Sequence, residues 1–443
     1  MLILDIFLVL IAIYLLYSIY SRNAYVLLLF IIFIFSSVWR LIGAFLIDFW
    51  GPVYADELFK YVGGSRGVYF FISILSFIMV LVFIKLRFRE KDKSLLKSAF
   101  VSKTIFVKFA GVKLENWVLC FLLLLHFSVL IETIKIGQFP LLSGLPRWRY
   151  VLEYAGPITK HVMGFFVTLN AFLHGYLYIF FKYKYESKIA LRLVILSIIM
   201  QEFIFFAQGN KFTTPFFSLL WTFSIISIVF LKKNRYRLKD LMKPLFIIFC
   251  IGVIFAGTLY RVYIVNRGYT STYLKKFLYH RLFIAPNQLN YDAIDRAVFK
   301  GENDLTESFD LIFVNRLPMG ANPSINYLMY KARGPEVLNI ECGFTDAYPG
   351  ILFELGGGLI GGLILEIIFA IIYVFSMYKM IFFVALGRLI PATFFFFIAQ
   401  AGTQINYQGQ FPTYRFIIKL ALVSILYFIS IRNRRCINCY VEK

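Results

Sequence analysis

The chain has 443 residues, of which 60% are hydrophobic and only 16% are charged, and it carries a formal net charge of +22. About a quarter of the residues of a soluble globular protein are charged, so this composition excludes a water-soluble enzyme and indicates an integral membrane protein. The basic excess does not indicate nucleic-acid binding, because more than half of the Lys and Arg residues lie in short loops and a tail next to apolar segments.

Eleven apolar segments are long enough to cross a membrane, since a spanning helix needs about 20 residues. We therefore expect an all-α polytopic membrane protein. The predicted spans are 2–20, 24–47, 68–85, 115–133, 161–181, 189–206, 214–231, 244–261, 349–377, 380–400 and 416–431. The first segment lacks a basic n-region and a small-residue cleavage site, which predicts a retained helix rather than a cleaved signal.

The distribution of Lys and Arg predicts the orientation. Arg22 and the loops 85–113, 182–192, 232–243, 379–388 and 432–443 hold 26 of the 46 basic residues. These loops alternate correctly along the span order, so the positive-inside rule places them in the cytoplasm. The N-terminus and the loop 262–348 then lie outside. The chain divides into 1–261 with eight spans, 262–348 as one large outer loop, and 349–443 with three spans and a basic tail.

Two loops carry sequence signals of their own helices. In 85–113, the residues Leu95, Leu96, Phe100, Ile105 and Phe106 stand among lysines, which predicts an amphipathic stretch at the membrane surface.

In the outer loop, Tyr273–Phe283 has one apolar face and predicts a second interfacial helix. Asn290–Lys300 predicts a further helix, with Asn290 as its cap, Asp292 complementing its dipole and Gly301 at the C′ position. The Pro- and Gly-rich stretch 315–349 is predicted to be irregular and to line a wet cavity.

Basic residues on the outer face are informative, because the positive-inside bias depletes that face. The guanidinium group matches two phosphate oxygens at once, so arginines at the span rims predict a clamp for a lipid-linked pyrophosphate. The predicted substrate-binding residues are Arg147, Arg149, Lys211, Arg261, Arg267, Arg281, Arg316 and Arg415. The alternative is that each side chain reaches ordinary phospholipid headgroups.

Asp346 is the leading candidate for a general base. It stands between aromatic residues just before the ninth span, where partial desolvation raises the pKa of a carboxyl group into a useful range. Glu341 is the second candidate. The alternative is a capping or solvated acid. Glu366, Glu202 and Arg40 lie within predicted spans, where ionisable groups are costly and indicate function, although their pairing stays open.

No metal-binding pattern stands out. The five cysteines predict neither a disulfide framework nor a zinc site, because the single C-x-x-C pair at Cys436 and Cys439 has no second pair nearby. The four histidines, His126, His161, His174 and His280, lack metal-ligand spacing and are expected to serve helix packing or the membrane interface.

Three short motifs resemble a known family. Gly209-Asn210-Lys211 resembles a Gly-x-basic turn that opens a span, and Asn322-Pro323-Ser324 with Asn326-Tyr327 resembles an outer-loop segment. The stretch 353–361, with Glu354 and several glycines, resembles the start of the span after the loop. Together with the late outer loop, these motifs resemble the Wzy-type oligosaccharide repeat-unit polymerases. The related ligases show a histidine in this loop that has no clear counterpart here, which favours the polymerase.

The resemblance implies a GT-C-like glycosyltransferase in the bacterial inner membrane, with an active site that faces the periplasm and uses no nucleotide sugar. It would polymerise undecaprenyl-pyrophosphate-linked oligosaccharides in O-antigen or capsule synthesis. Its partners would be these substrates, membrane lipids, a chain-length regulator and a flippase, and it would need no metal or other cofactor.

Other functions remain open at this stage. One is an O-antigen ligase-like or other lipid-linked glycosyltransferase. Another is a transporter or flippase of lipid-linked sugar, although such proteins show internal repeats and broken helices that the sequence does not show. An acyltransferase would need a His or Ser dyad near the membrane, for which only His161 and His280 are outer candidates.

Overall fold

The computed structural model describes residues 2–55, 58, 60–64, 67–102, 108–109, 112–140, 149–208, 213–232, 246, 250, 253, 257, 270–302, 348–408, 418 and 420–425. This part of the chain is mostly helical, as the composition predicted. It also contains two short antiparallel hairpins, β1 (Val53–Ala55) with β2 (Lys60–Val62), and β3 (Lys108–Phe109) with β4 (Val112–Lys113).

Six helices are long and apolar enough to cross a membrane. They are α1 (Leu2–Leu29), α2 (Ile31–Phe49), α3 (Val68–Arg87), α5 (Leu114–Ile136), α9 (Lys188–Ala207) and α17 (Leu359–Ala385). These helices show a membrane-embedded, all-α type of protein. Three further predicted spans, 161–181, 214–231 and 380–400, overlap with α8 (Gly164–Ile179), α10 (Thr213–Ile226) and α18 (Leu389–Gln408). The predicted spans 244–261 and 416–431 lie largely outside the described residues.

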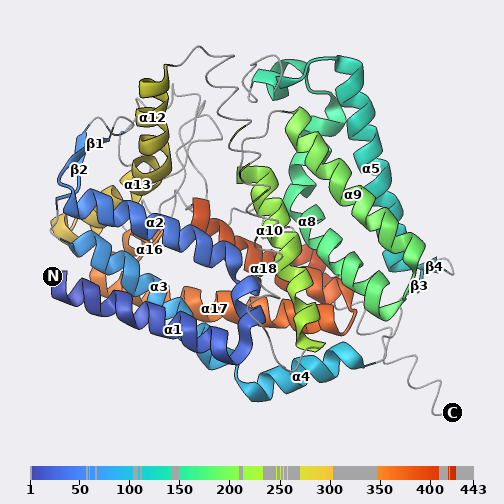
Figure 1. Ribbon diagram of the computed structural model, residues 1–443, viewed down its shortest axis with the longest axis horizontal. Helices are drawn as coiled ribbons and strands as arrows, with labels where there is room; N and C mark the ends of the chain where they lie inside the picture. Colours follow the sequence, from blue (N-terminus) through green and yellow to red (C-terminus); the bar gives the residue numbers. More distant parts are fainter. Residues whose placement is uncertain are drawn as a thin grey trace.

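The long helices form two groups (Figure 1). In the first group, α1, α2 and α17 all pack on α3; in the second, α8 contacts α5, α9 and α10. Helix α18 packs along α17 and also touches α2 and α8, while α10 touches α1 and α2. The two groups therefore share one continuous set of helix contacts.

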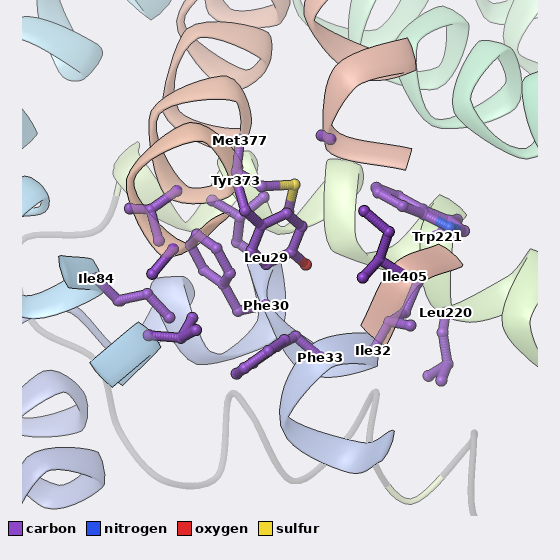
Figure 2. Packing of buried hydrophobic residues seen from close by; sticks show 14 of the residues in the cluster. Leu29, Phe30, Ile32, Phe33, Ile84, Leu220, Trp221, Tyr373, Met377 and Ile405 are labelled. Carbon is purple, nitrogen blue, oxygen red and sulfur yellow. The ribbon is translucent and has the colours of Figure 1, made fainter. Parts of the chain in front are cut away.

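The hydrophobic core lies where α2, α3, α10, α17 and α18 approach one another (Figure 2). The ring of Tyr373 lies 5.8 Å from that of Phe30 and 5.6 Å from that of Phe33, centroid to centroid. Such tilted aromatic pairs contribute about 0.5–1.5 kcal/mol beyond the area they bury. Trp221 of α10 and Ile405 of α18 extend the same cluster.

The break expected at residues 21–23, between the first two spans, is confirmed as a kink rather than a loop. Helix α1 continues past it to Leu29 and is kinked at Asn23, whose backbone leaves the helical region. The Asn23 amide donates a 2.6 Å hydrogen bond to the carbonyl of Phe88, just past the end of α3. This side-chain bond ties the kink to the neighbouring helix, so the chain bends there without a loop.

One end of the bundle carries the described parts of the basic loops 85–113 and 182–192; we call it the basic end. Here α4 (Glu90–Val101) confirms a helix in the predicted amphipathic stretch, although Ile105 and Phe106 lie outside the described residues. Lys184, in the helical turn η3 (Phe180–Lys184), donates to the carbonyls of Phe100 and Ser102 at 2.7 and 2.9 Å. Loops that were predicted to share one side of the membrane are thus in contact.

The opposite end carries β1, β2 and the described helices of the large loop; we call it the loop end (Figure 1). The loop helices are α12 (Ser271–Tyr279), η6 (His280–Ile284), α13 (Ala285–Ile294) and η7 (Asp295–Lys300). They form one uninterrupted helical run instead of the two predicted helices. The predicted capping role of Asn290 and dipole role of Asp292 are therefore wrong, because both residues lie mid-helix. Gly301 does end the run, with φ +65°.

The last described elements also differ from the predicted boundaries. The predicted span 349–377 is divided into a short helix α16 (Gly350–Leu355) and the long α17. Helix α17 continues to Ala385, and α18 begins at Leu389, so the turn between them is much tighter than the predicted loop 379–388. The reason for the division lies in the glycines described below.

The separation of the two ends generates a prediction about topology. Reporter fusions at Leu95, in α4, and at Gly301, after η7, should report opposite sides of the membrane. The basic loops should keep Leu95 in the cytoplasm, since positive charge is retained there. Alkaline phosphatase and β-galactosidase activities of the two fusions measure this. Cytoplasmic signals from both sites would contradict the arrangement.

Candidate functional site

Buried polar side chains gather around residues 348–355, which we call the junction segment. This segment follows directly on the large loop and leads into α17. Three groups of hydrogen bonds and ion pairs, which together we call the junction network, connect it to α2, α3, α13, α17 and α18. Such a concentration of polar groups within an apolar bundle indicates a site with a specific role.

The first group centres on Arg40 of α2, which is buried. Its Nη1 donates to the carbonyl of Tyr348 at 3.1 Å and to Oδ1 of Asn406 at 3.2 Å. The Tyr348 hydroxyl donates to Glu366 of α17. Asn406 in turn donates to Oγ of Ser36 at 2.7 Å. Arg40 and Glu366 are thus connected through Tyr348, which the sequence could not show.

The second group centres on Asn290 of α13. Its Oδ1 accepts the backbone N–H of Gly350, and its Nδ2 donates to the Tyr69 hydroxyl at 2.8 Å. The Tyr69 hydroxyl lies 2.8 Å from Oδ1 of Asn287, to which it donates. All four residues are buried. One asparagine therefore connects the loop helix, the junction segment and membrane helix α3.

The third group is a set of four charges. Asp292 of α13 forms ion pairs with Lys60 of β2 and with Arg296, one helical turn further on. Arg296 also lies 3.4 Å from Glu354 of the junction segment, measured from Nη2 to Oε1. The charges of the two positive and two negative side chains sum to zero. Neutrality matters here, because a single unpaired buried charge costs several kcal/mol.

Glycines explain why the chain breaks after the junction segment. A Cβ on Gly361 would lie 1.9 Å from the carbonyl oxygen of Gly356, and one on Gly356 would lie 2.2 Å from the carbonyl carbon of Gly361. Gly358 has φ +122°, a region that L side chains rarely adopt. The chain can therefore fold back on itself only with glycine at these positions. This is the glycine-containing stretch on which the family resemblance partly rests.

Most of the predicted site residues are not among the residues that the structure describes. The following lie outside the described residues: Asp346, Glu341, Arg147, Lys211, Arg261, Arg267, Arg316 and Arg415. Arg281 has its backbone in η6, and its side chain is outside the description. Arg149 is described in full, just before the turn η1 (Tyr150–Tyr154).

Arg149 is half exposed and forms an ion pair within its own helical turn. Its Nε lies 2.9 Å from Oε1 and 3.0 Å from Oε2 of Glu153. The hydrogen bond to Glu153 raises the pKa of Arg149. A phosphate group that used Arg149 would have to displace or share this carboxylate.

A second polar cluster lies between α5, α8 and α9. His126 Nδ1 and His174 Nε2 each lie 2.9 Å from Oγ of Ser197, and Asn170 Nδ2 lies 3.4 Å from His126 Nε2. The Asn170 donor makes Nε2 of His126 the acceptor, so His126 donates to Ser197 and Ser197 donates to His174. Both imidazoles are then neutral, which suits complete burial. The predicted helix-packing role fits these two histidines.

At the loop end, Lys300 and Tyr291 of the loop helices also have polar partners. Lys300 lies 2.9 Å from Asp295, and this hydrogen bond raises the pKa of Lys300. The Tyr291 hydroxyl donates to the carbonyl of Gly63 at 3.3 Å, and burial raises the pKa of Tyr291. The Tyr291 hydrogen bond helps to hold α13 against the end of the hairpin β1–β2, whereas the Lys300–Asp295 pair lies within η7.

Several members of the junction network were missed from the sequence. Lys60, Arg296, Glu354 and Asn406 received no role, and Asn290 received the wrong one. A signal did exist: Asn287 and Asn290 are three residues apart, which places two amides on one face of a helix. An amide face that turns toward a bundle rather than toward water predicts buried hydrogen-bond partners.

Comparison of this chain with known proteins finds no relative. The chain matches no protein-family model, no curated protein and no solved structure. Among the residues that the structure describes, no three His, Cys, Asp or Glu side chains come together as a metal site would require.

The network predicts a specific loss of stability. Asn290→Ala should lower the free energy of unfolding by about 2–4 kcal/mol, because it leaves the Gly350 N–H and the Tyr69 hydroxyl buried with one partner fewer. Chemical denaturation in detergent, followed by circular dichroism, measures the change. Lys276→Ala on the exposed side of α12 is the control and should stay within about 0.5 kcal/mol of the parent. Equal stability of all three proteins would refute the role of Asn290.

Proposed function

We propose that this chain is a membrane glycosyltransferase that polymerises undecaprenyl-pyrophosphate-linked oligosaccharide repeat units for O-antigen or capsule. The reaction takes place at the periplasmic face of the bacterial inner membrane, and the loop 262–348 lies on that face between the eighth and ninth of eleven spans. The junction network is the observation that carries the proposal, since it holds the start of α17 and the loop helix α13 in one fixed arrangement.

The network suits a catalytic loop for a physical reason. Reacting groups must be held within about 0.5 Å of their productive positions, and this needs support from rigid elements. The junction segment is fixed to α2 by Arg40, to α13 by Asn290 and to α17 by the Tyr348 hydroxyl. Asp346 lies two residues before this segment in the sequence. A base at that position would therefore be close in sequence to backbone that the junction network holds in place.

The proposed chemistry uses a base and a basic clamp. Asp346, or Glu341 in its place, accepts the proton of an acceptor-sugar hydroxyl. The hydroxyl oxygen forms a bond to the anomeric carbon of the donor glycan as the bond from that carbon to the pyrophosphate oxygen breaks. Undecaprenyl pyrophosphate leaves with the electron pair. Arginine and lysine side chains stabilise the charge that develops on it.

The clamp is assigned to the basic residues that the sequence predicts on the outer face: Arg147, Arg149, Lys211, Arg261, Arg267, Arg281, Arg316 and Arg415. Arginine suits this role better than lysine because its planar group donates two parallel hydrogen bonds to phosphate. The partners of the enzyme are the lipid-linked oligosaccharides, the surrounding lipids, a chain-length regulator and a flippase.

The proposal predicts a defined phenotype. A deletion strain should attach a single repeat unit to its lipid anchor, which a gel of surface glycan detects. Complementation with Asp346→Asn should leave that phenotype, because the variant keeps the shape of the side chain and removes its basic charge. Arg267→Ala should shorten the chains, and Arg267→Lys should restore them only partly.

Arg192→Ala, at the basic end, is the matched control for the loss of one positive charge and should restore normal chains. Immunoblots confirm that every variant accumulates. Long polymers in the deletion strain itself would refute the function. If Asp346→Asn makes normal polymers, the role of general base is assigned to Glu341 instead. Glu341→Gln then tests that assignment.

A proton-coupled transporter of lipid-linked sugar is the second candidate. It is favoured by the cluster of His126, Ser197 and His174, since hydrogen-bonded titratable groups inside a membrane are typical of proton pathways. The same deletion strain separates the two functions. A polymerase deletion leaves the single repeat unit on the periplasmic side, whereas a transporter deletion leaves it on the cytoplasmic side.

A further inference from the structure

An apolar groove runs along the first group of helices, between α1 and α2, with α3 as its floor. It has a volume of about 370 Å³, and every lining side chain is apolar. Ile13 of α1 and Ile42 of α2 form its walls, and Phe70 and Phe77 of α3 form its floor. The volume falls within the range of about 300–1,000 Å³ that is usual for ligand sites.

The groove is open to its surroundings at the side. Ile13 is 56% exposed and Ile42 is 47% exposed, whereas Phe70 and Phe77 are buried. Water has no hydrogen-bond partner in such a space, so hydrocarbon must fill it when the helices lie in a bilayer. The occupant is therefore the chain of a lipid.

The direction of the groove matches a lipid whose headgroup lies at the loop end. Phe45 stands one helical turn before the end of α2, and Phe70 lies in the first turn of α3; both mark the loop end of the groove. Leu16 and Val38 mark its other limit, near the middle of their helices. A chain that enters at the loop end would thus run inward along α1 and α2.

The groove also adjoins the junction segment. Leu41 and Phe77 line both the groove and a small pocket of about 10 Å³, which Arg40, Tyr348 and Pro349 also line. On another side of α2, Gly43 lies against the loop helices, with no room for a Cβ beside Asn287. A single helix, about 10–12 Å across with its side chains, therefore separates the groove from the loop helices.

We propose that this groove binds the isoprenoid chain of the polyprenyl lipid carrier. The proposal rests on the function proposed above, because that function brings this lipid to the loop end. Hydrocarbon gains little from leaving other lipid tails, so preference for one chain must come from packing and from its headgroup. A pyrophosphate held at the loop end raises the effective concentration of its own chain at the groove.

Filling the groove tests the proposal. Ile13→Trp and Ile42→Trp place a bulky side chain in it, and Leu10→Trp is the matched control, because Leu10 is 58% exposed on the same helix but does not line the groove. The probe is undecaprenyl phosphate, titrated onto the purified full chain in detergent and followed by native mass spectrometry. Both groove variants should bind it roughly three- to tenfold more weakly, which corresponds to about 0.7–1.4 kcal/mol.

Two results would overturn the proposal. One is wild-type affinity in both groove variants, with Leu10→Trp as the reference for folding and yield. The other is equal competition by phosphatidylglycerol, which would make the groove an ordinary acyl-chain site. The glycan gel of the deletion strain reads the proposed function separately. If the deletion strain makes long polymers and the groove variants bind undecaprenyl phosphate more weakly, the polymerase function is rejected and the lipid-binding groove is supported.

Discussion

A polar group inside the bilayer must find its partner within the protein, and the architecture of the loop end follows from this constraint. Hydrocarbon offers no hydrogen bonds, so each buried amide, hydroxyl or charge costs several kcal/mol unless it is paired. Arg40 satisfies the constraint with a backbone carbonyl and an amide oxygen from parts of the chain more than 300 residues away. The helices that contribute to such a network have little freedom to move independently.

The two ends of the molecule use charge in different ways. At the basic end, Arg87 lies 3.6 Å from the ring centroid of Tyr378 and 3.0 Å from Asp92, so basic side chains there also fasten α4 to α17. At the loop end, Asp292 and Glu354 are fully buried and are balanced by Lys60 and Arg296. Exposed pairs contribute little to stability, whereas breaking a buried pair is strongly destabilising. The loop end therefore depends more on its individual side chains.

Close packing and open grooves arise from the same set of helices. Glycines let α16 fold back on α17 and let α13 approach α2 at Gly43, which brings the loop helices into contact with the membrane helices. Between α1 and α2 the opposite holds, because both helices pack on α3 while large side chains line the space between them. Small residues thus close the side of α2 that faces the loop helices, and bulky residues line a groove on another side of the same helix.

The sequence by itself determined the class of protein, since twenty-residue apolar segments can only be satisfied as membrane helices. It also determined that α4 is a helix and that the helical run of the loop ends at Gly301. Both features depend on neighbouring residues alone. Periodicity could not show that α12 and α13 form one run, since the π-helical turn η6 that joins them packs against α2. Only the tertiary structure decided the role of Asn290 and the connection of Arg40 to Glu366 through Tyr348. Asn290 and Tyr69 are 221 residues apart and Arg40 and Tyr348 are 308 apart, so hydrogen bonds between them depend on the tertiary fold, which local sequence does not contain.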